Sequence, residues 1–553
     1  MQNNISAFIK DALWNLKCNL KVANMNKLYL DKEYDKIFAK ICNGDNITLL
    51  RYGDGERSIM TGKAVKAQEG WESPNTLTEL GKALLDTLTL QEENVYYGIS
   101  CPCCDSQAYY WYRSRIVNEN ITFANLFVNI NYRRFKDDFY KVERDAVVIA
   151  NYKGKGKRIG NLNILDYFSV SDSCQDFWNN GEAEKLINKV IQMYGEKNDI
   201  LYVVSAGPLS EPIIFNLYKN NPNNCYIDFG SSIDSFIHGS DTRPYTNPKS
   251  IFGSRNCYMH DCKRSEFDVS VVLTTYKKPD ALEKQLSAIK NQSLKPKEIF
   301  LFQDGISNPY RIIFNEEIIK EFTEINISES NKGVWERFRY AKDSCSSKYV
   351  CLFDDDTIPG ERWLENCLSN MFEQEGVYGT VGIMMQNYKK YPYSGFTRVG
   401  WHNPYHNSAQ VDFVGHSWFV KREYLDYMFD NTEEYQKYKL AAEDMCLSFK
   451  CKEHGVNTYV PPHPYYDFSY WGSLPEYGLK FGQASTAISQ NPTGCKLMRE
   501  ALEKFVSNGW AFIYDENPRL IKKQVNGAKI DHVKSLVKTF IKKVKRKLKI
   551  DVQ

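Results

Sequence analysis

The sequence predicts an α/β protein with at least two domains. Short apolar runs rich in β-branched and aromatic residues alternate with amphipathic helical segments along most of the chain. The chain has 553 residues, which is too long for one ordinary hydrophobic core. Acidic residues follow two of the predicted strands, at 54–56 and at 354–356. Because ligands bind at the carboxyl ends of strands in open α/β sheets, each domain is expected to carry a site there.

The composition is that of a globular protein, with 42% hydrophobic and 25% charged residues. A net charge of +3 gives no reason to expect a nucleic-acid partner. The sequence starts without a charged-then-apolar signal segment, and no apolar run approaches the length that spans a bilayer. We therefore expect a cytoplasmic protein with free thiols. Two groups of cysteines lack the paired spacing of zinc ligands, so ordinary thiols are expected there: Cys101, Cys103 and Cys104, and Cys257 and Cys262 around His260.

Residues 1–45 have helical periodicity and are predicted as an N-terminal extension. A domain over residues 46–245 follows, and its first strand leads into Arg51-Tyr-Gly-Asp-Gly-Glu56. Gly53 and Gly55 let the backbone turn tightly, which would allow Asp54 and Glu56 to face one cation. The alternative is an ordinary Asp-Gly turn without chemistry.

The same domain continues with strands predicted at 94–99, 146–150, 200–204 and 225–229. After 200–204 the chain turns through Ser205-Ala-Gly207-Pro-Leu-Ser210 into a helix. Small residues at such a turn leave N–H groups free at a helix N-terminus, so Ser205 and Gly207 are candidates for binding a phosphate.

Three motifs of this domain resemble the GT-D fold of bacterial glycosyltransferases: Arg51 to Glu56, Ser205 to Pro208, and Asp228-Phe-Gly230. The resemblance spans about residues 45–245 and implies a Rossmann-like domain. It also implies that Asp54 and Glu56 bind a metal and a nucleotide-sugar and take part in catalysis. The segment after the last strand does not clearly reproduce the family's tail, so the acceptor side is undetermined.

Residues 246–266 are polar and without periodicity, and they are predicted as a linker. A second domain, 267–480, opens with a strand ending in Thr274-Thr275-Tyr276, and a second strand ends in Gln303-Asp304-Gly305. Asn331-Lys332-Gly333 precedes a helix that carries Arg337. The apolar run 349–353 then leads into Asp354, Asp355 and Asp356. Three carboxylates at the exit of a buried strand are costly unless a cation offsets them, although a solvated acidic turn is the alternative.

This order of motifs resembles the GT-A fold of family 2 glycosyltransferases, also a Rossmann-like domain, over about residues 267–470. The resemblance implies that Thr274, Thr275, Tyr276 and Asp304 hold the nucleoside and that Asp354 or Asp355 meets the ribose. It assigns Asp356, with Asp354, to a Mg²⁺ or Mn²⁺ ion that bridges the diphosphate. We also assign Lys332 and Arg337 to binding of the donor.

Two downstream sites complete the candidate set. Glu443 and Asp444 look like the family's acidic pair at a helix start, and we assign Asp444 as the general base of an inverting transfer, with Glu443 second. The alternative is a helix-capping pair without chemistry. His463 is a candidate metal ligand, although a lone histidine is more often a surface or packing residue.

Residues 481–553 are predicted as a helical C-terminal region that ends in a basic amphipathic helix. Between Lys529 and Lys549 there are nine Lys and Arg but one acid, Asp531. Apolar residues from Ile530 to Leu548 fall on one helical face. Such a helix is typical of binding to an anionic membrane, here the inner face of the cell membrane. The alternatives are docking onto its own domain and binding of nucleic acid.

The sequence thus predicts a bifunctional glycosyltransferase that adds hexosyl or N-acetylhexosaminyl groups from nucleotide-sugars, in particular UDP-sugars. The expected acceptor is a glycan or lipid-linked glycan of a bacterial surface polysaccharide, of the capsule or lipopolysaccharide type. Two alternatives remain open. Only the C-terminal domain is active and the N-terminal domain binds acceptor, or the chain is a non-enzymatic membrane- or glycan-binding scaffold.

Overall fold

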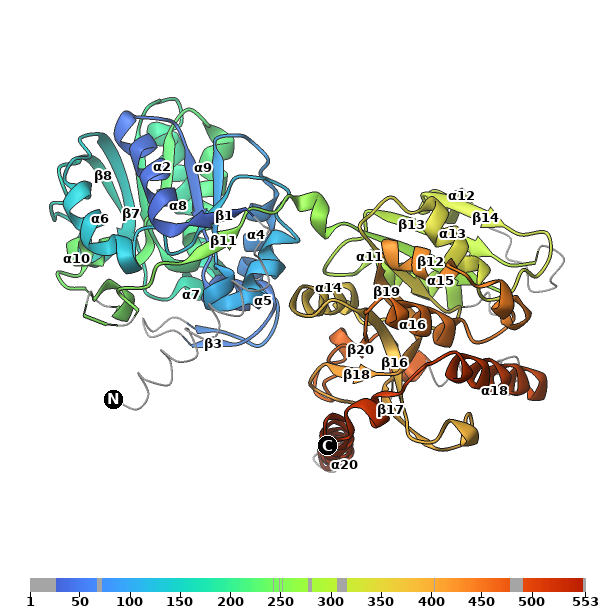
Figure 1. Ribbon diagram of the computed structural model, residues 1–553. Helices are drawn as coiled ribbons and strands as arrows, with labels where there is room; N and C mark the ends of the chain where they lie inside the picture. The colour runs from blue at the N-terminus through green and yellow to red at the C-terminus, as the bar shows by residue number, and fades with distance from the viewer. Residues whose placement is uncertain are drawn as a thin grey trace. The chain divides into compact units, whose positions relative to one another are not determined.

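A computed structural model describes residues 26–550 except 67–71, 242, 248, 251, 277–280, 306–315, 402 and 478–490 (Figure 1). The side chains of residue 316 and of residues 542–550 are outside this description as well. The chain divides into two compact units, Met1–Arg264 and Ser265–Gln553. Each unit is built on its own large sheet with parallel strands, so the predicted α/β class is confirmed.

The first unit is built on a sheet of seven parallel strands. Its central strands are buried over nearly their whole length, which requires helices on both faces of the sheet. The strands, in spatial order, are β6 (Ile121–Phe123), β5 (Val95–Ile99), β2 (Thr48–Arg51), β10 (Cys225–Asp228), β9 (Leu201–Ser205), β7 (Asp145–Asn151) and β8 (Asn163–Val170).

Two groups of helices pack on this sheet. Helices α4, α7, α8 and α9 contact one another, whereas α2 and α6 meet through Phe38 and Phe135. Strands β2 and β10, which are far apart in the sequence, are parallel neighbours in the sheet, so the loops that follow them meet at its carboxyl edge, where ligands bind in open α/β sheets. The helices are α2 (Leu30–Asn43), α3 (Asp54–Met60), α4 (Glu79–Asp86), α5 (Pro102–Arg113), α6 (Tyr132–Phe139), α7 (Cys174–Asn179), α8 (Glu182–Tyr194), α9 (Ser210–Asn220) and α10 (Asp234–Ile237). Strand β3 (Val65–Lys66) pairs antiparallel with β4 (Glu72–Ser73).

Both ends of the first unit differ from the predicted boundaries. Helix α2, predicted within an extension, buries Tyr34, Ile37 and Ile41 completely in the core of the unit. The predicted linker 246–266 contains strand β11 (Tyr258–His260), which pairs with β1 (Lys27–Tyr29). The unit therefore continues to Arg264, because this strand pair closes it with residues far apart in the sequence. Residues 1–25 of the predicted extension lie outside the described residues.

The second unit contains a mixed sheet of nine strands. Its parallel half consists of β14 (Glu324–Ile327), β13 (Glu298–Gln303), β12 (Val269–Thr275) and β15 (Tyr349–Phe353). The sheet continues from β15 through β19 (Phe413–Lys421), β16 (Val377–Met385), β20 (Thr458–Val460) and β18 (Ala409–Val411), with β17 (Phe396–Gly400) on β16. Helices α11 (Leu282–Lys290), α12 (Glu316–Ile319), α13 (Glu336–Ser344), α14 (Trp363–Glu373), α15 (Glu423–Phe429) and α16 (Glu443–Glu453) complete it.

The C-terminal region is helical, as predicted, in the part that the structure describes. Helices α18 (Pro492–Ser507) and α19 (Ile513–Glu516) are followed by the long α20 (Pro518–Ile550) (Figure 1). Leu502 and Phe505 of α18 are fully buried, so this region belongs to the core of the second unit. Within the described part of the chain, each helix is too short or too polar to cross a bilayer.

Candidate functional site

The candidate site of the second unit lies where its parallel strands end. Strands β12, β13 and β15 run in the same direction, so the residues that follow them meet at one edge of the sheet. Thr274 Oγ1 donates a hydrogen bond to the carbonyl of Phe353, at 2.8 Å, which ties the end of β12 to the end of β15. The side-chain hydroxyl of Thr275 is buried without a hydrogen-bond partner. The strand ends predicted to bind the donor therefore do lie together.

Asp304 holds the loop that follows β14. Its carboxylate accepts hydrogen bonds from the backbone N–H groups of Lys332, at 2.8 Å, and Gly333, at 3.2 Å. Asn331 Nδ2 in turn donates to the hydroxyl of Tyr276, at 2.8 Å. Burial raises the pKa of Asp304, although the two N–H groups oppose the shift. Hydrogen bonds thus connect Tyr276 and Asp304, both predicted to bind the nucleoside, to the loop 331–333. Lys332 takes part through its backbone N–H, and its side chain is exposed.

Asp354 and Asp356 meet a histidine that was not predicted as a ligand. One ligand atom each from Asp354, Asp356 and His416 lies within 4.8 Å of the others. His416 reaches this position because β19 carries an irregularity opposite Gly379 and Val381, where the pairing shifts by one residue. Its φ of +68° is rare for a residue with a side chain, and such strain gathers at functional sites. Asp355, between the two other acids, is half-buried.

Arg337 joins the acids of β15 to those of α16. Its guanidinium contacts Asp354 Oδ1 at 2.5 Å and Glu443 Oε1 at 2.9 Å, and it stacks over the Trp418 ring with 4.8 Å to the centroid. We predicted that Arg337 binds the donor, but its side chain is only 8% exposed and both of its terminal nitrogens face carboxylates. Its position instead makes it the counter-charge of Asp354 and Glu443, whose side chains are 26% and 12% exposed.

Glu443 and Asp444 begin α16 after Ala442, whose backbone has a φ of +59°. One oxygen of Asp444 accepts the N–H of Met445 at 2.7 Å, and the other faces Gly415 of β19. Burial and the neighbouring Glu443 raise the pKa of Asp444 well above its usual range. Burial also raises the pKa of Glu443, but the positive charge of Arg337 opposes this rise. The two adjacent acids therefore differ in basicity, and Asp444 is the one that holds a proton more tightly.

His463 does not join this cluster. It is fully buried, its ring packs against Trp363 and Trp471, and burial lowers its pKa to about 4. One ring nitrogen is 2.8 Å from the carbonyl of Pro461, and the other accepts the N–H of Gly472 at 3.4 Å. Because the backbone occupies both nitrogens, the structure assigns His463 to packing, which corrects the prediction of a metal ligand. Trp418 and Trp471 are also core residues.

The predicted acidic pair of the first unit does not converge. Asp54 is exposed at the start of α3, whereas Glu56 turns back and accepts the N–H of Gly53 at 2.8 Å. Glu56 and Gly53 thus form a helix cap, and Gly55 lies in the first turn of the helix. The expectation that Asp54 and Glu56 face one cation is therefore not met, because the cap points Glu56 towards the backbone.

A different set of acids gathers near the ends of β2 and β10. Burial raises the pKa of Glu56 to about 7, and the charges of Asp228 and Asp54 add to this shift. The pKa of Asp228 rises to about 6 by burial, although Arg51 opposes the change. Glu211, which is 1% exposed, has one oxygen without a hydrogen-bond partner and a pKa raised well above its usual range by burial. We call Glu56, Glu211 and Asp228 the first-unit acids.

The predicted phosphate loop lies beside these acids. Ser205 Oγ donates to the carbonyl of Gly230 at 3.0 Å, and Gly207 opens a short turn, Gly207–Leu209, that leads into α9. The N–H of Ala206 already donates to Ser210 Oγ, at 3.0 Å. Glu211 occupies the first turn of α9, next to the predicted phosphate loop, and its raised pKa favours the neutral carboxyl.

Comparison with known proteins places the second site in a family. Residues 270–429 match the model for glycosyl transferase family 2. Among solved structures, a crystal structure of TarS from S. aureus is similar at 15% identity, with a TM-score of 0.28. That match covers 48% of this chain and 49% of TarS, so it spans about half the length of either protein. No curated protein matches the chain. Residues 270–429, which include Asp304, Asp354, Asp356 and His416, therefore form a glycosyl transferase family 2 domain.

Proposed function

We propose that the second unit transfers a sugar from a UDP-sugar to a hydroxyl of a bacterial surface glycan, with inversion at the sugar carbon. The observation that carries this proposal is the meeting of Asp354, Asp356 and His416 with the Arg337–Glu443–Asp444 group inside and beside a family 2 domain. It brings together, at one sheet edge, ligands for a cation and a buried acid of raised pKa.

The three ligands fit a divalent cation. Two carboxylates suit Mg²⁺ and Mn²⁺, and the imidazole of His416 favours Mn²⁺ because a nitrogen ligand suits a transition ion better. Asp354, Asp356 and His416 would hold this ion, which supplies positive charge for the diphosphate of the donor. Thr274, Thr275, Tyr276 and Asp304 would position the nucleoside at the same edge.

The residues of α16 would perform the proton transfer. As the acceptor hydroxyl attacks the anomeric carbon, Asp444 takes the hydroxyl proton on its free carboxylate oxygen. The new carbon–oxygen bond forms while the bond to the diphosphate breaks, and the electron pair leaves with the diphosphate. Arg337 opposes the rise of the Glu443 pKa, and burial together with the charge of Glu443 would make Asp444 a stronger base than an isolated aspartate.

Calorimetry with UDP tests the donor site. We expect binding in the presence of Mn²⁺ that is weakened by chelation and by Asp356→Asn. Asp515→Asn is a matched control, because Asp515 is an exposed aspartate on α19 of the same unit. Equal binding by Asp356→Asn and wild type would refute the assignment of the cation ligands, and absence of UDP binding by the wild type would favour the scaffold alternative.

We further propose that the first unit is a second, GT-D-type transferase domain. Its support is the position of the first-unit acids at the ends of β2 and β10, where Arg51 supplies a positive charge. Asp228→Asn and Asp356→Asn, assayed separately for donor hydrolysis and for transfer, distinguish the two sites. If Asp228→Asn retains every activity, the first unit instead serves only to bind or orient the acceptor.

Helix α20 is the basis of a proposal about where in the cell the protein is found. Its first half docks on the second unit through Ile521, Gln524, Ala528 and Asp531, all of which are buried. Asp531, the one acid of the basic segment, accepts the N–H of His406 at 3.0 Å. The positions that face the unit therefore follow one stripe of the helix.

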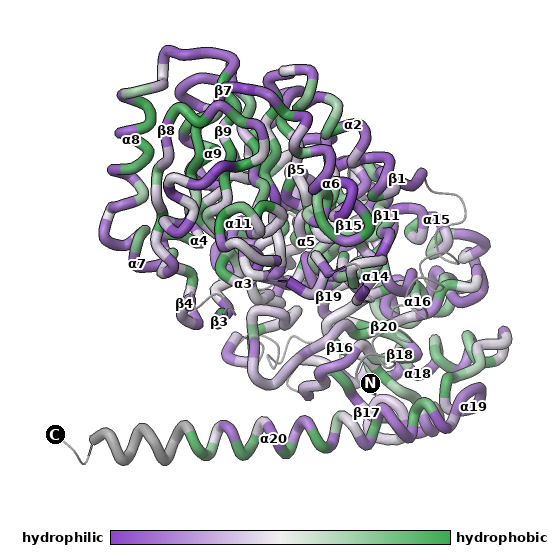
Figure 2. Tube along the Cα trace, turned by 90° about the vertical axis from the view of Figure 1, so that its left-hand side faces the viewer, coloured by the Kyte–Doolittle hydropathy of each residue, from purple (hydrophilic) through white to green (hydrophobic). Residues whose placement is uncertain are grey.

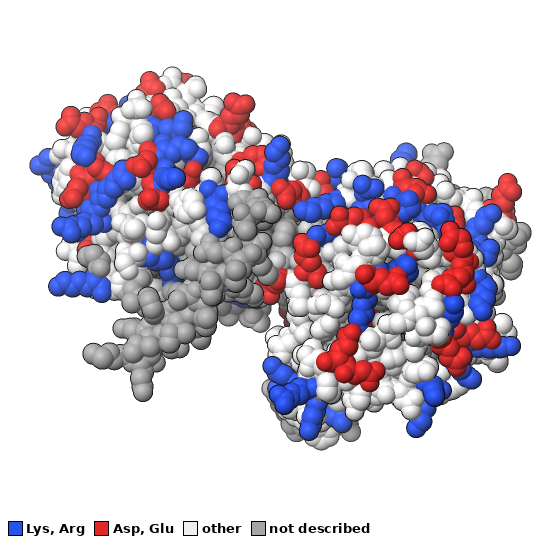
Figure 3. Space-filling model, in the orientation of Figure 1, with Lys and Arg blue, Asp and Glu red and all other residues white. Residues whose placement is uncertain are grey.

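The apolar residues of α20 lie on another stripe, and they are 46–68% exposed. At about 100° per residue, this stripe and the docking stripe are roughly opposite each other on the helix. Figure 2 shows apolar and polar residues alternating along α20. Figure 3, in the orientation of Figure 1, shows a group of Lys and Arg side chains at the bottom of the second unit, the side where Figure 1 places α20. The exposed residues are Ile530, Val533, Leu536, Val537, Phe540 and Ile541.

We propose that this stripe enters the surface of an anionic membrane, at the inner face of the cell membrane where lipid-linked acceptors would be available. Sedimentation with anionic lipid vesicles tests it. Phe540→Asp should reduce binding, whereas its neighbour Thr539→Asp, which makes the same charge change off the apolar stripe, should not. Equal vesicle binding by both variants would refute the proposal. It would also be refuted if the protein dimerised with rising concentration and Phe540→Asp abolished the dimer but left vesicle binding unchanged.

A further inference from the structure

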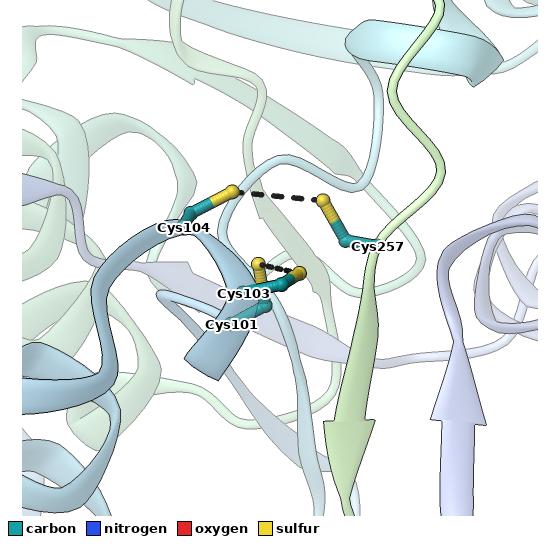
Figure 4. A group of neighbouring side chains, drawn as sticks. All are labelled: Cys101, Cys103, Cys104 and Cys257. Carbon is teal, nitrogen blue, oxygen red and sulfur yellow. Dashed lines mark hydrogen bonds between the residues drawn. The ribbon is translucent and has the colours of Figure 1, made fainter. Parts of the chain in front are cut away.

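Four cysteines from two distant segments of the first unit meet at one point. Cys101, Cys103 and Cys104 lie at the start of α5, and Cys257 directly precedes β11. One sulfur from each lies within 4.8 Å of the others (Figure 4). The sulfurs of Cys101 and Cys103 are 3.1 Å apart, and those of Cys104 and Cys257, which are 153 positions apart in the sequence, are separated by 3.6 Å. We call these residues the cysteine cluster.

We propose that the cysteine cluster is a structural Zn²⁺ site with four thiolate ligands. A tetrahedral Zn²⁺ with bonds of about 2.3 Å to sulfur separates its ligands by about 3.8 Å, which falls inside the range of the sulfur distances here. The sequence did not suggest it, because three ligands come from one Cys-X-Cys-Cys run and the fourth from the far end of the unit. Tertiary contacts between α5 and β11, among them the hydrogen bond from Tyr109 to the carbonyl of His260, bring the fourth ligand to the others.

Two nitrogen donors already point at the sulfurs. Arg255 Nη1 is 3.0 Å from the sulfur of Cys104, and Asn125 Nδ2 is 3.4 Å from the sulfur of Cys257. A neutral thiol is a weak acceptor, whereas a thiolate attracts such donors strongly. Around zinc, these groups would be the surrounding hydrogen bonds that orient the ligands and offset the excess negative charge of four thiolates.

The other chemistries of clustered cysteines fit less well. A disulfide has a sulfur–sulfur distance of about 2.05 Å, and one bond would leave two thiols of the cluster unused. An iron–sulfur cluster places its own iron and sulfide atoms between the thiolates, and the 4.8 Å span leaves room for a single ion instead. Four thiolates in a tetrahedron are typical of zinc.

The site would fasten the last segment of the first unit to α5. That segment is already held by hydrogen bonds from Tyr109 to the carbonyl of His260, at 2.6 Å, and from Arg113 to the carbonyl of Cys262, at 2.7 Å. The zinc ion would add a cross-link next to these bonds. Loss of the ion should therefore loosen β11 and the strand β1 paired with it.

The metal content of the full-length protein, purified without added metal, tests the proposal. We expect about one tightly bound zinc ion per chain, released when a mercurial reagent blocks the thiols. Cobalt in its place should give the visible absorption of a tetrahedral thiolate complex. Zinc-free protein with unchanged thermal unfolding would overturn the proposal, and so would a disulfide within the cluster found by mass spectrometry.

Substitutions locate the ion. Cys104→Ser should lose most of the zinc, whereas Cys42→Ser, an exposed cysteine on α2 of the same unit, should keep it. Asp356→Asn in the second unit should also keep it, which separates this site from the proposed donor site. Retention of zinc by both Cys104→Ser and Cys257→Ser would overturn the assignment. If these variants fail to fold, the spectrum of the cobalt-substituted wild type tests the site instead: absorption of a tetrahedral thiolate complex supports the proposal, and its absence overturns it.

Discussion

Gly333→Ala tests whether the Asp304 loop shapes the donor site. Gly333 has a φ of +92°, and a Cβ atom at this position would lie 2.4 Å from the carbonyl oxygen of Lys439. The obstructing atoms belong mainly to the backbone, so they cannot swing aside as a side chain would. The loop 331–333 must therefore move, and its hydrogen bonds to Asp304 must lengthen or break.

The expected size of the effect follows from two terms. A left-handed backbone costs a residue other than glycine about 1–2 kcal/mol. Hydrogen bonds to a charged group contribute about 1.5–3 kcal/mol each, and the displacement of the loop endangers two of them. If the UDP-binding form of the loop needs these hydrogen bonds, loss of even one of them should lower UDP affinity at least about tenfold, since a tenfold change equals about 1.4 kcal/mol.

Gly455→Ala is the matched control. Gly455 has a φ of +76°, but no atom lies within 4 Å of the place that its Cβ atom would take, so only the backbone cost applies. Calorimetry with UDP and Mn²⁺, together with thermal unfolding, should show that both variants are less stable and that only Gly333→Ala binds UDP weakly. Equal affinity losses in the two variants, or unchanged affinity in Gly333→Ala, would refute the assigned role of the loop.

Three further predictions concern the buried charges. Arg337→Met should destabilise the second unit by about 3 kcal/mol in urea denaturation, because it leaves Glu443, 12% exposed, and Asp354, 26% exposed, without their counter-charge. Glu443→Gln in the same chain should restore part of the loss, and an unchanged midpoint in Arg337→Met would contradict this. The rate of transfer should rise with pH through an apparent pKa well above about 3.9, since Asp444 must lose its proton, and Glu443→Gln should move this limb to lower pH; a limb that stays in place would contradict it. Glu211 binds its proton more tightly in the folded protein than in the unfolded chain, so the free energy of unfolding should fall as the pH rises above about 4.3. Glu211→Gln, which stays neutral, should therefore melt at a higher temperature than wild type at pH 8, and a lower melting temperature would contradict this.

The parallel strands of the second unit could be predicted from the sequence. The run 349–353 coincides with β15, and the strands predicted to end at Thr274–Tyr276 and at Gln303–Gly305 correspond to β12 and β13. These strands are covered on both faces, so they appear as continuous apolar runs. Their ends carry the Asp304 and Asp354–Asp356 motifs, and this is why a ligand site at this edge of the sheet could be predicted.

The features that escaped prediction depend on contacts between distant residues. His416 reaches Asp354 through an irregularity of β19, which depends on how β19 pairs with β16. Arg337 turned out to bridge acids on two elements, and no local pattern indicates such a bridge. The strand pair β1–β11 has three residues per strand, too few for a periodic signal, so its segment was predicted as a linker.

The central claim is that Asp444 is the base of a sugar transfer at the second unit. Turnover of UDP-sugars by wild type and by Asp444→Asn, with UDP affinity measured on the same samples, tests it most directly. We expect Asp444→Asn to keep its UDP affinity and to lose at least about a hundredfold in turnover, the usual contribution of a general base. Undiminished turnover by Asp444→Asn would contradict the account.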